Sequence, residues 1–575
     1  RKILAAEIAV ADSRAVLEMH SPPRPGFPVM VPPRGTVIDD SLPDAIMAAR
    51  ADIATLAANG YPTMDESGGS NAWAIAGWRS ASGAALLFAD SHRVVEQPTT
   101  YYPVTLSCDA FHISGLLLAG VPLFSSFGEN GRVAWAITNA SADAQDVYVE
   151  RFRTADGALQ VLHGDTWRPA EVTTETIWVR DGDAIDIERC RTRHGPVVHG
   201  DPRSGTALTL RWTVHLAARN DLGIARAMLD ASSSDELLDL QAGWIDPVNN
   251  LIVADAGGNV GYMLRGKLPR RSDVQGRALP RPGWFADEPW DELVDVGSAT
   301  RVTDPPDGYV FTTNNTVSAE PDVDVSQDIA DWYRAVRLTE LLDAGSPAFE
   351  DCQRMQTDVV SVAMRHWAQL LAMRRLEDAN ARLAAAAIIG ADGSLEHRPG
   401  ATVYVCLLRR VAAALIDAHH PSIGWILDDT ASNSAGLIRR WLAQLSWPSS
   451  REGLINLDQQ TDAWWSARLA EAWTDHLALP SDDWSKLRAQ HSPIVGTAQM
   501  GDGETLNVAT YPVAVGAGFP ITIGVALRFA VELDSGGKRG WAIPGGTAET
   551  EFDSPLLEAW RDGALCPFDA GPSPY

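Results

Sequence analysis

The chain has 575 residues, of which 45% are hydrophobic and 21% charged, an ordinary composition for a globular protein of one large or several smaller domains. Asp and Glu (74) outnumber Lys and Arg (47), so the formal net charge is −27, and a surface this acidic argues against binding to nucleic acid or anionic lipid. The longest uncharged stretch, 505–527, contains the helix breakers Pro512 and Pro520. We therefore expect no membrane-spanning helix.

The first 69 residues show little periodicity except for an Ala-rich segment, 42–59, which predicts a helix ended by Gly60. From Ser70 to about residue 320 the pattern is typical of strands. Apolar residues alternate from Leu208 to Leu216, which predicts a half-buried strand. Two apolar runs, 251–254 and 260–264, flank a Gly-Gly pair, which predicts a hairpin.

Residues 321–483 show the helical period, because apolar residues return every three or four positions in three segments. These residues are Tyr404, Leu408, Val411 and Leu415; Leu437, Ile438, Trp441, Leu442 and Leu445; and Trp465, Leu469, Ala472 and Trp473. Strand patterns return at 521–533 and 541–543, before a short helix at 556–560. This order predicts a sheet domain, 70–320, interrupted by a helical insertion, 321–483, and completed by C-terminal strands, 484–575.

A Gly-Gly-Ser-Asn-Ala-Trp segment stands where the strand pattern begins, with Gly69 directly before Ser70. By pattern alone it is a turn that leads into a strand. It also suits a self-cleaving serine, whose hydroxyl attacks the carbonyl of Gly69, because glycine leaves that carbonyl unshielded and tolerates a strained peptide. After cleavage Ser70 would carry a nucleophile and a free α-amine, whose ordinary pKa of about 7.7–8.0 lets it act as a base near neutral pH.

The chain resembles the penicillin acylase family of N-terminal nucleophile hydrolases, which includes cephalosporin acylases and acyl-homoserine-lactone acylases. The resemblance covers nearly all of 70–575 and depends on an ordered series of blocks. These are Ser70-Asn71-Ala72-Trp73, Asp90-Ser91-His92-Arg93, Phe127-Gly128-Glu129-Asn130-Gly131, Val133-Ala134-Trp135, Asp143-Ala144-Gln145-Asp146-Val147-Tyr148, Ala254-Asp255 with Gly258-Asn259-Val260-Gly261-Tyr262, and Leu506-Asn507. The resemblance implies an α+β fold, an αββα sandwich with a largely helical insertion. It also implies self-cleavage at Gly69–Ser70 into a heterodimer, with 1–69 as the end of the α-chain region plus spacer.

The same resemblance implies roles for single residues. Ser70 matches the nucleophile, and His92 matches a catalytic helper that hydrogen-bonds Ser70. Glu532 resembles the glutamate that orients this histidine, although a strand-edge carboxylate fits it nearly as well. The oxyanion donors would be the backbone N–H of Asn139 and the side-chain amide of Asn250.

Neighbouring residues leave two of these assignments open. Asn249 is an alternative to Asn250 as the oxyanion donor. Arg271 matches an arginine that steadies the oxyanion asparagine, with Arg270 as its rival, and a solvated basic turn is the plain alternative for both. One position departs from the family, because Glu129 stands where many relatives have histidine.

The resemblance also suggests a metal and a substrate pocket. Asp143 and Asp146 match positions that hold a structural Ca²⁺ in family members, although two acidic residues on a loop are more often just solvated. The acyl pocket is expected near Arg93, Tyr102 and Phe127. No organic cofactor is expected.

The sequence therefore predicts an amide hydrolase that removes an acyl group from a penicillin-like, cephalosporin-like or other N-acylated amine. An acyl-homoserine-lactone acylase, or an unprocessed homologue that only binds acylated ligands, is the alternative. The expected partners are a small N-acyl substrate and the chain's own α segment after cleavage. Family resemblance favours a periplasmic or secreted location, although a cytoplasmic one stays open.

Overall fold

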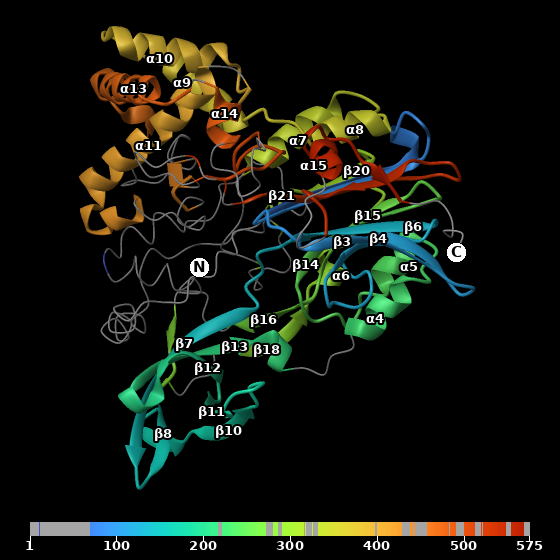
Figure 1. The fold of residues 1–575 in the computed structure, drawn as a ribbon, viewed down its shortest axis with the longest axis vertical. Coiled ribbons are helices and arrows are strands. Elements are labelled where there is room, and N and C mark those ends of the chain that lie inside the picture. The colour runs from blue at the N-terminus through green and yellow to red at the C-terminus, as the bar shows by residue number, and fades with distance from the viewer. Residues whose placement is uncertain are drawn as a thin grey trace.

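The computed structural model describes residues 11, 69–216, 221–271, 280–285, 290–315, 317, 325, 332–396, 399–427, 437–439, 441–442, 457–481, 483–489, 500–511, 519, 521, 523–547 and 554–568. Its centre consists of two stacked sheets (Figure 1). The first has the order β20 (Tyr309–Thr312), β1 (Gly69–Ile75), β2 (Ala85–Arg93), β21 (Gly524–Leu533), β22 (Arg539–Ala542) and β23 (Cys566–Pro567). The second has the order β19 (Val302–Thr303), β15 (Val260–Arg265), β14 (Asn249–Asp255), β6 (Val133–Asn139), β5 (Phe127–Glu129), β4 (His112–Leu118) and β3 (Tyr101–Ser107).

The alternation of side chains along β1 explains how the two sheets are covered. Ala72 and Ala74 pack into the core between the sheets, together with Ala136 and Ile252 of the second sheet. Their neighbours Trp73 and Ile75 point the other way, into a core shared with α7 (Tyr333–Asp343) and α8 (Phe349–Met355). The second sheet is covered by α4 (Asp221–Met228) and α5 (Ser234–Asp239). The described layers are therefore helix, sheet, sheet, helix, as the αββα prediction requires.

A third sheet extends from the second one in the lower half of Figure 1. Its order is β10 (Glu171–Ile177), β11 (Ile185–Thr192), β12 (Gly195–Asp201), β13 (Thr206–Trp212), β7 (Gln145–Ala155), β8 (Ala158–His163) and β9 (Thr166–Pro169), with β17 (Arg281–Pro282) beside β7. A separate pair joins β16 (Lys267–Arg271) to β18 (Trp290–Asp295). The remaining short helices are α6 (Gly297–Thr300) and α15 (Ser554–Arg561).

The helices between the two halves of the sandwich form a lobe of their own (Figure 1). They are α9 (Val362–Ala372), α10 (Ala379–Gly390), α11 (Gly400–His419), α13 (Asp462–Leu477) and α14 (Trp484–Ala489). The apolar residues predicted to share helix faces are buried together in one core, except Leu445, which lies outside the described residues, and Trp473, which is partly buried against it. No helix in the described ranges combines the length and apolar character needed to cross a bilayer.

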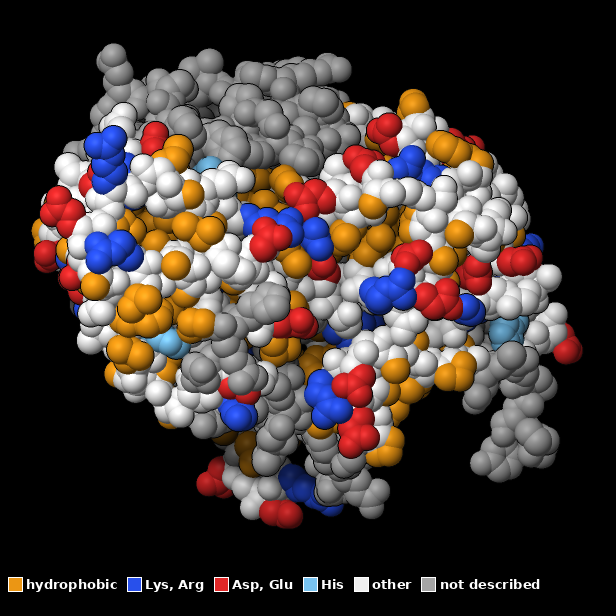
Figure 2. All heavy atoms as spheres, turned by 90° about the horizontal axis from the view of Figure 1, so that it is seen from above, with side chains coloured by type: hydrophobic (Ala, Val, Ile, Leu, Met, Phe, Trp, Pro, Cys, Tyr) orange, Lys and Arg blue, Asp and Glu red, His pale blue; other side chains and the backbone are white. Residues whose placement is uncertain are grey.

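Most predicted elements of the described chain are found, with one shortened. The predicted hairpin is β14–β15, paired from Asn249–Arg265 to Ala254–Val260. The strand predicted to reach Leu216 ends at Trp212, because Thr213–His215 form a 3-10 turn. The predicted helix 42–59 lies outside the described residues. On the face seen in Figure 2, basic and acidic side chains are interspersed and form no single continuous basic surface.

Candidate active site

Ser70 is the second residue of β1, which lies between β20 and β2 in the first sheet. In the β1–β2 ladder, Gly69 pairs with His92, Ser70 with Ser91, and Asn71 with Asp90. Side chains of paired residues lie on the same face of an antiparallel sheet. Ser70 therefore shares the face of Ser91, which looks toward the second sheet, whereas Asn71 and His92 share the face covered by helices.

Gly69 lies in a space that has no room for a side chain. A Cβ atom at this position would lie 2.9 Å from Asn314 Oδ1, 3.2 Å from His92 Nδ1 and 3.4 Å from one terminal nitrogen of Arg334. The hydroxyl of Ser70 donates to the Gly69 carbonyl oxygen over 2.6 Å. The peptide that the sequence predicts to be cut is thus surrounded by polar side chains on one side and by the serine hydroxyl on the other.

Asn314 connects the nucleophile strand to the second sheet. Its Oδ1 accepts from the Ser70 nitrogen over 2.7 Å, and its Nδ2 donates to the Asn139 carbonyl over 2.6 Å. Asn314 lies two residues after the end of β20 and has a φ of 64°, a left-handed conformation that asparagine tolerates better than most residues. Its side chain can therefore turn back across the end of β1.

Arg334, in the first turn of α7, holds this arrangement from the helical side. Its guanidinium donates to the Ser70 carbonyl over 3.0 Å, to Asn71 Oδ1 over 2.6 Å and to Asn314 Oδ1 over 3.0 Å. The side chain is buried. A buried guanidinium with three such acceptors fixes both the direction of the Ser70 carbonyl and the orientation of the Asn314 amide.

The two predicted oxyanion donors lie side by side, but one is already engaged. Asn250 is fully buried, and its Nδ2 donates to Thr138 Oγ1 over 3.0 Å and to the Asn139 carbonyl over 3.4 Å. Its Oδ1 accepts from the Tyr262 hydroxyl over 2.8 Å. The asparagine amide that reaches the Ser70 nitrogen is that of Asn314.

The rival asparagine, Asn249, faces away from this group. Its Oδ1 accepts from Arg265 Nε over 2.9 Å. Consecutive residues of a strand point to opposite faces, so Asn249 cannot share the surroundings of Asn250.

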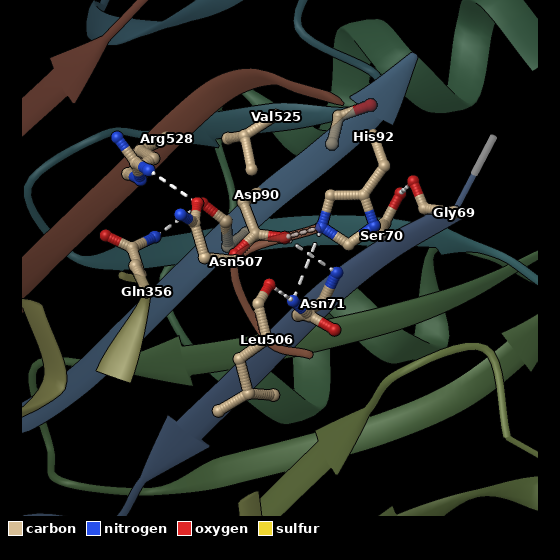
Figure 3. A network of polar contacts seen from close by, with 12 residues as sticks. Gly69, Ser70, Asn71, Asp90, His92, Gln356, Leu506, Asn507, Val525 and Arg528 are labelled. Carbon is tan, nitrogen blue, oxygen red and sulfur yellow. Dashed lines mark hydrogen bonds and ion pairs between the residues drawn. The ribbon is translucent and has the colours of Figure 1, made fainter. Parts of the chain in front are cut away.

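His92 is buried beneath the helical layer and pairs with Asp90, as Figure 3 shows. His92 Nε2 lies 2.7 Å from Asp90 Oδ1, which also accepts from the Asn71 backbone nitrogen over 3.0 Å. Burial lowers the pKa of His92 below its ordinary value, and Arg334 and Arg528 lower it further, while Asp90 opposes the shift. The imidazole is therefore neutral at neutral pH.

The hydrogen bond predicted between His92 and Ser70 is not formed, since the Ser70 hydroxyl donates to Gly69. His92 Nδ1 has no hydrogen-bond partner among the described residues. The register explains this, because the two side chains start from opposite faces of the sheet.

Glu532 does not lie beside His92. In the β2–β21 ladder Glu532 pairs with Leu86, near the opposite end of β2. Its carboxylate accepts from the backbone nitrogen of Lys538 over 3.2 Å. The predicted contact is thus absent, and Asp90 occupies the position expected for Glu532. The reason is the strand direction, since Val525 and not Glu532 is the residue of β21 opposite His92.

Arg271 contacts the predicted calcium residues and not the oxyanion asparagine. Its Nε donates to Asp146 Oδ2 over 2.9 Å, and a terminal nitrogen donates to the Asp143 carbonyl over 2.7 Å. Its rival Arg270 pairs with Glu292 at the surface. The arginine that steadies an asparagine beside Ser70 is Arg334, from a different element.

Asp143 and Asp146 lie close together, and both contact the guanidinium of Arg271. Trp290 Nε1 also donates to Asp146 Oδ2, over 2.5 Å. Ca²⁺ needs about 6–8 oxygen ligands, and the described residues contain no group of three or more acidic, histidine or cysteine side chains suited to a metal. On their own, two carboxylates facing an arginine do not make a calcium site, so the predicted metal stays a prediction.

Of the predicted pocket residues, Arg93 lies on β2 of the first sheet, whereas Phe127 and Tyr102 lie on β5 and β3 of the second sheet. Phe127 is buried between the sheets, with its ring 5.9 Å from that of Tyr101. The Tyr101 hydroxyl lies 3.1 Å from Ser91 Oγ, and Arg93 Nε donates to it from the surface over 3.1 Å. Tyr102 is half-buried and donates to the Thr547 carbonyl over 3.4 Å.

Three residues of this site were not assigned a role from the sequence: Asp90, Asn314 and Arg334. Asp90 stands two residues before His92, and this spacing on a strand places both on one face. Asn314 follows a strand as part of an Asn-Asn pair, a turn signal. Nothing in the local pattern of Arg334 distinguishes it from other helical arginines.

Comparison with known families identifies a relationship that extends along almost the whole chain. The family model described as penicillin amidase matches residues 5–573. The chain belongs to the penicillin amidase family.

Relatives of this family member carry two kinds of name. The "Penicillin acylase 2 proenzyme" of Pseudomonas sp. (strain SE83) is 30% identical over 546 residues, covering 89% of this chain and 69% of the relative. The "Acyl-homoserine lactone acylase QuiP" of Pseudomonas fluorescens (strain Pf0-1) is 31% identical over 297 residues, covering 50% of this chain and 36% of the relative. The chain thus spans about two thirds of the first relative and about a third of the second.

A solved structure with a similar fold is the thermostable penicillin G acylase from Alcaligenes faecalis, with a TM-score of 0.66 at 18% identity. The match covers 87% of this chain and 96% of that one. It supports the N-terminal nucleophile hydrolase fold of the family member.

Proposed function

We propose that this amide-bond hydrolase of the penicillin amidase family is a self-processing acylase that uses Ser70 as an N-terminal nucleophile. The observation that carries the proposal is the position of Ser70. Ser70 lies at the start of β1, where its backbone nitrogen donates to Asn314 and its carbonyl accepts from Arg334. These two contacts fix the backbone on both sides of the reacting hydroxyl.

In the first reaction, Ser70 Oγ attacks the Gly69 carbonyl carbon. The C–N bond then breaks, the nitrogen takes up the hydroxyl proton, and an ester remains. Water hydrolyses the ester and leaves a carboxylate on Gly69 and a free amine on Ser70. The absence of a side chain at Gly69 supports this step because the carbonyl stays accessible. The two chains remain together as a heterodimer.

In the mature enzyme, Ser70 Oγ attacks the amide of the substrate, and the α-amine of Ser70 accepts its proton. The Asn250 amide and the Asn139 N–H are the oxyanion donors, because Asn314 presents its acceptor Oδ1 to the Ser70 nitrogen and its Nδ2 already donates to the Asn139 carbonyl. Arg334 steadies Asn314. Collapse of the intermediate releases the amine, and water hydrolyses the acyl-enzyme.

The acyl group would bind between the sheets, against the aromatic rings of Tyr101 and Phe127. Aromatic rings at this position would suit a phenylacetyl or aliphatic acyl group on a penicillin-like, cephalosporin-like or other amine. An acyl-homoserine lactone is the second candidate because relatives carry that name. A periplasmic or secreted location belongs to the same proposal.

The experiment is intact-mass measurement and N-terminal sequencing of the expressed protein, beside the variant Ser70→Ala. We expect a new terminus reading Ser-Asn-Ala-Trp in the wild type and an unbroken chain in the variant. A folded wild-type chain that stays intact would overturn the proposal and favour a protein that only binds acylated ligands.

Once processing is established, substrate choice can be measured with penicillin G, a cephalosporin and acyl-homoserine lactones of several chain lengths. Removing one oxyanion donor, with Asn250→Ala, should lower kcat by about 10²–10³-fold. Asn249→Ala is the matched variant, since Asn249 is the neighbouring buried asparagine and points to the opposite face of β14. A larger loss in Asn249→Ala would assign the donor to Asn249.

A further inference from the structure

The pairing of His92 with Asp90 fixes which ring nitrogen carries the proton. Asp90 is acceptor-only when ionised, and its Oδ1 lies 2.7 Å from His92 Nε2, so Nε2 must be the donor. A neutral imidazole then presents a lone pair at Nδ1. This atom has no hydrogen-bond partner among the described residues and lies next to Gly69.

The contact of Asn71 with His92 would by itself favour the other tautomer, so the closer Asp90 carboxylate is what sets it. Asn71 Nδ2 lies 3.4 Å from His92 Nε2 and donates over 2.9 Å to the Leu506 carbonyl. Its Oδ1 is taken by Arg334. Without Asp90, the nearest polar group for Nε2 is this amide donor, which would favour the opposite tautomer.

The Ser70 nitrogen has one acceptor now and needs a second after cleavage. In the unbroken chain its single N–H donates to Asn314 Oδ1. A free neutral amine has two N–H groups and one lone pair. The second N–H would point where the Gly69 bond was, and that space borders His92 Nδ1, 3.2 Å from the position of a Gly69 Cβ.

We propose that Asp90 and His92 are positioning residues for the α-amine of Ser70. Asp90 holds the Nε2–H tautomer, and His92 Nδ1 accepts one amine N–H, directly or through one water in the space left by Gly69. Asn314 Oδ1 accepts the other N–H. The lone pair of the nitrogen is then left for the hydroxyl proton of Ser70, which lies on the other face of the sheet. This inference rests on the proposed function.

Arg528 and Gln356 hold the part of β2 that carries Asp90. Arg528 pairs with Asp90 in the β2–β21 ladder and is buried, donating to Asn507 Oδ1 over 3.0 Å. Gln356 fixes the same strand by donating to the Ala89 carbonyl over 2.9 Å. The strand segment that carries Asp90 is therefore held independently of His92.

The first test reads the tautomer of His92 by nitrogen NMR of histidine-labelled protein, with His92→Asn to assign the signal. We expect the Nε2–H form at neutral pH in the wild type. The Nδ1–H form would overturn the proposal. This measurement does not depend on activity or on a variant of Asp90.

The second test is kinetic and uses the processed enzyme. Asp90→Ala should lower kcat by at least about 100-fold, because loss of the residue that orients a catalytic histidine costs up to about 10⁴-fold in a well-studied triad. Asp90→Asn keeps the shape of the side chain but can present an amide N–H to Nε2, which favours the opposite tautomer, so it should lose activity by a similar factor. In a His92→Ala background, Asp90→Ala should cause no further loss, since both residues act through one nitrogen.

Two comparisons complete the design. Asp255→Asn removes another buried carboxylate, which bonds Ser234 and Asn259 far from the nucleophile, and should change stability without changing kcat. Glu532→Gln tests the residue first expected beside His92; a loss in Glu532→Gln, with none in Asp90→Ala, would overturn the inference. Additive losses for Asp90 and His92 would also overturn it.

Failure of the two proposals can be told apart. A wild type that neither cleaves itself nor hydrolyses amides contradicts the proposed function. A wild type that does both, with an unaffected Asp90→Ala, contradicts only the role of Asp90.

Discussion

At Gly69, directly before the nucleophile, the surrounding atoms leave no room for a larger residue. The space at Gly69 is bounded by Asn314, whose amide is held by Arg334 and the Ser70 nitrogen. It is bounded on the other side by the His92 ring, which Asp90 holds in place. Neither neighbour can move aside without breaking a buried hydrogen bond, so this position is a sensitive test of the cleavage geometry.

Replacing Gly69 by Ala should slow self-cleavage by at least tenfold. The added methyl group would lie 2.9 Å from Asn314 Oδ1 and displace the amide that binds the Ser70 nitrogen. Time-resolved mass measurement of freshly folded protein gives the rate. As a control, the two chains can be expressed separately, with the second chain starting at Ser70. Residue 69 is then not bonded to Ser70 in the mature site, so this pair should show normal kcat. Wild-type cleavage rates in Gly69→Ala would contradict the packing.

His92 should also leave a signature in the pH dependence of stability. Burial lowers its folded-state pKa below the ordinary value near 6.5, so between these two values the unfolded chain binds more protons. The free energy of unfolding should therefore fall as the pH drops below about 6.5 and through the folded-state pKa.

The measurement is urea unfolding from pH 5 to 8 in a Ser70→Ala background, which keeps all chains unbroken. The groups facing His92 are Asp90, which opposes the shift, and Arg334 and Arg528, which favour it. His92→Gln should remove part of the slope below pH 6.5 and leave the slope above it unchanged. An identical slope in both proteins would mean that His92 titrates normally.

At the scale of elements, one arginine joins two strands that the sequence treats as unrelated. Arg271, at the end of β16, contacts Asp146 at the start of β7. Both side chains of this pair are almost completely buried. Removing one partner of a buried pair leaves an uncompensated charge and usually costs about 3–5 kcal/mol.

Arg271→Gln should therefore lower the free energy of unfolding by about 3–5 kcal/mol. Arg270→Gln is the matched control, because Arg270 pairs with Glu292 at a more exposed position and should cost no more than about 1 kcal/mol. Chelation with EDTA should leave the Tm of the wild type unchanged, and added Ca²⁺ should stabilise only Arg271→Gln. A fall in wild-type Tm on chelation would instead support the predicted calcium site.

The sequence predicts elements where period and turn signals agree. The β14–β15 hairpin has a Gly-Gly turn between two apolar runs, and α11 and α13 have continuous apolar faces. The strand predicted through Leu216 was too long because alternation continues by chance through a 3-10 turn. A local pattern records side-chain periodicity and not hydrogen bonding, so it cannot locate such an end.

The site was predictable only where its residues are close in the chain. Ser70 stands at a recognisable motif, and His92 lies on the adjacent strand. Asn314 and Arg334 reach Ser70 across 244 and 264 residues, a pairing that depends on the sheet order and no local pattern contains. The contact predicted between Glu532 and His92 is absent for the same reason, since the strand register places Glu532 opposite Leu86.

At the scale of the whole molecule, the helical lobe has a core of its own beside the sandwich. Trp465 is fully buried in that core, with its ring 5.8 Å from Trp367. Separate cores can unfold in separate steps, which breaks simple two-state behaviour. We expect calorimetry of the unbroken chain to show more than one transition.

Trp465→Ala should destabilise the helical lobe by about 3–5 kcal/mol and lower one transition more than the others. Leu477→Ala lies on the same helix but is exposed, so its effect should stay within about 0.5 kcal/mol. An equal shift of every transition in Trp465→Ala would show that lobe and sandwich unfold as one unit.

The distances along the chain between the partners of Ser70 have a consequence for synthesis. Asn314 is added 244 residues after Ser70, and Leu506, whose carbonyl accepts from the Asn71 side chain, is added 435 residues after Asn71. Under the proposed function, translation must pass Leu506 before all the contacts that orient Ser70 and its neighbour can form. A product that stops earlier keeps its nucleophile blocked inside a peptide bond and is harmless to the amides around it. The broken backbone is then a lasting record, in each molecule, that synthesis passed Leu506 and that the site was assembled.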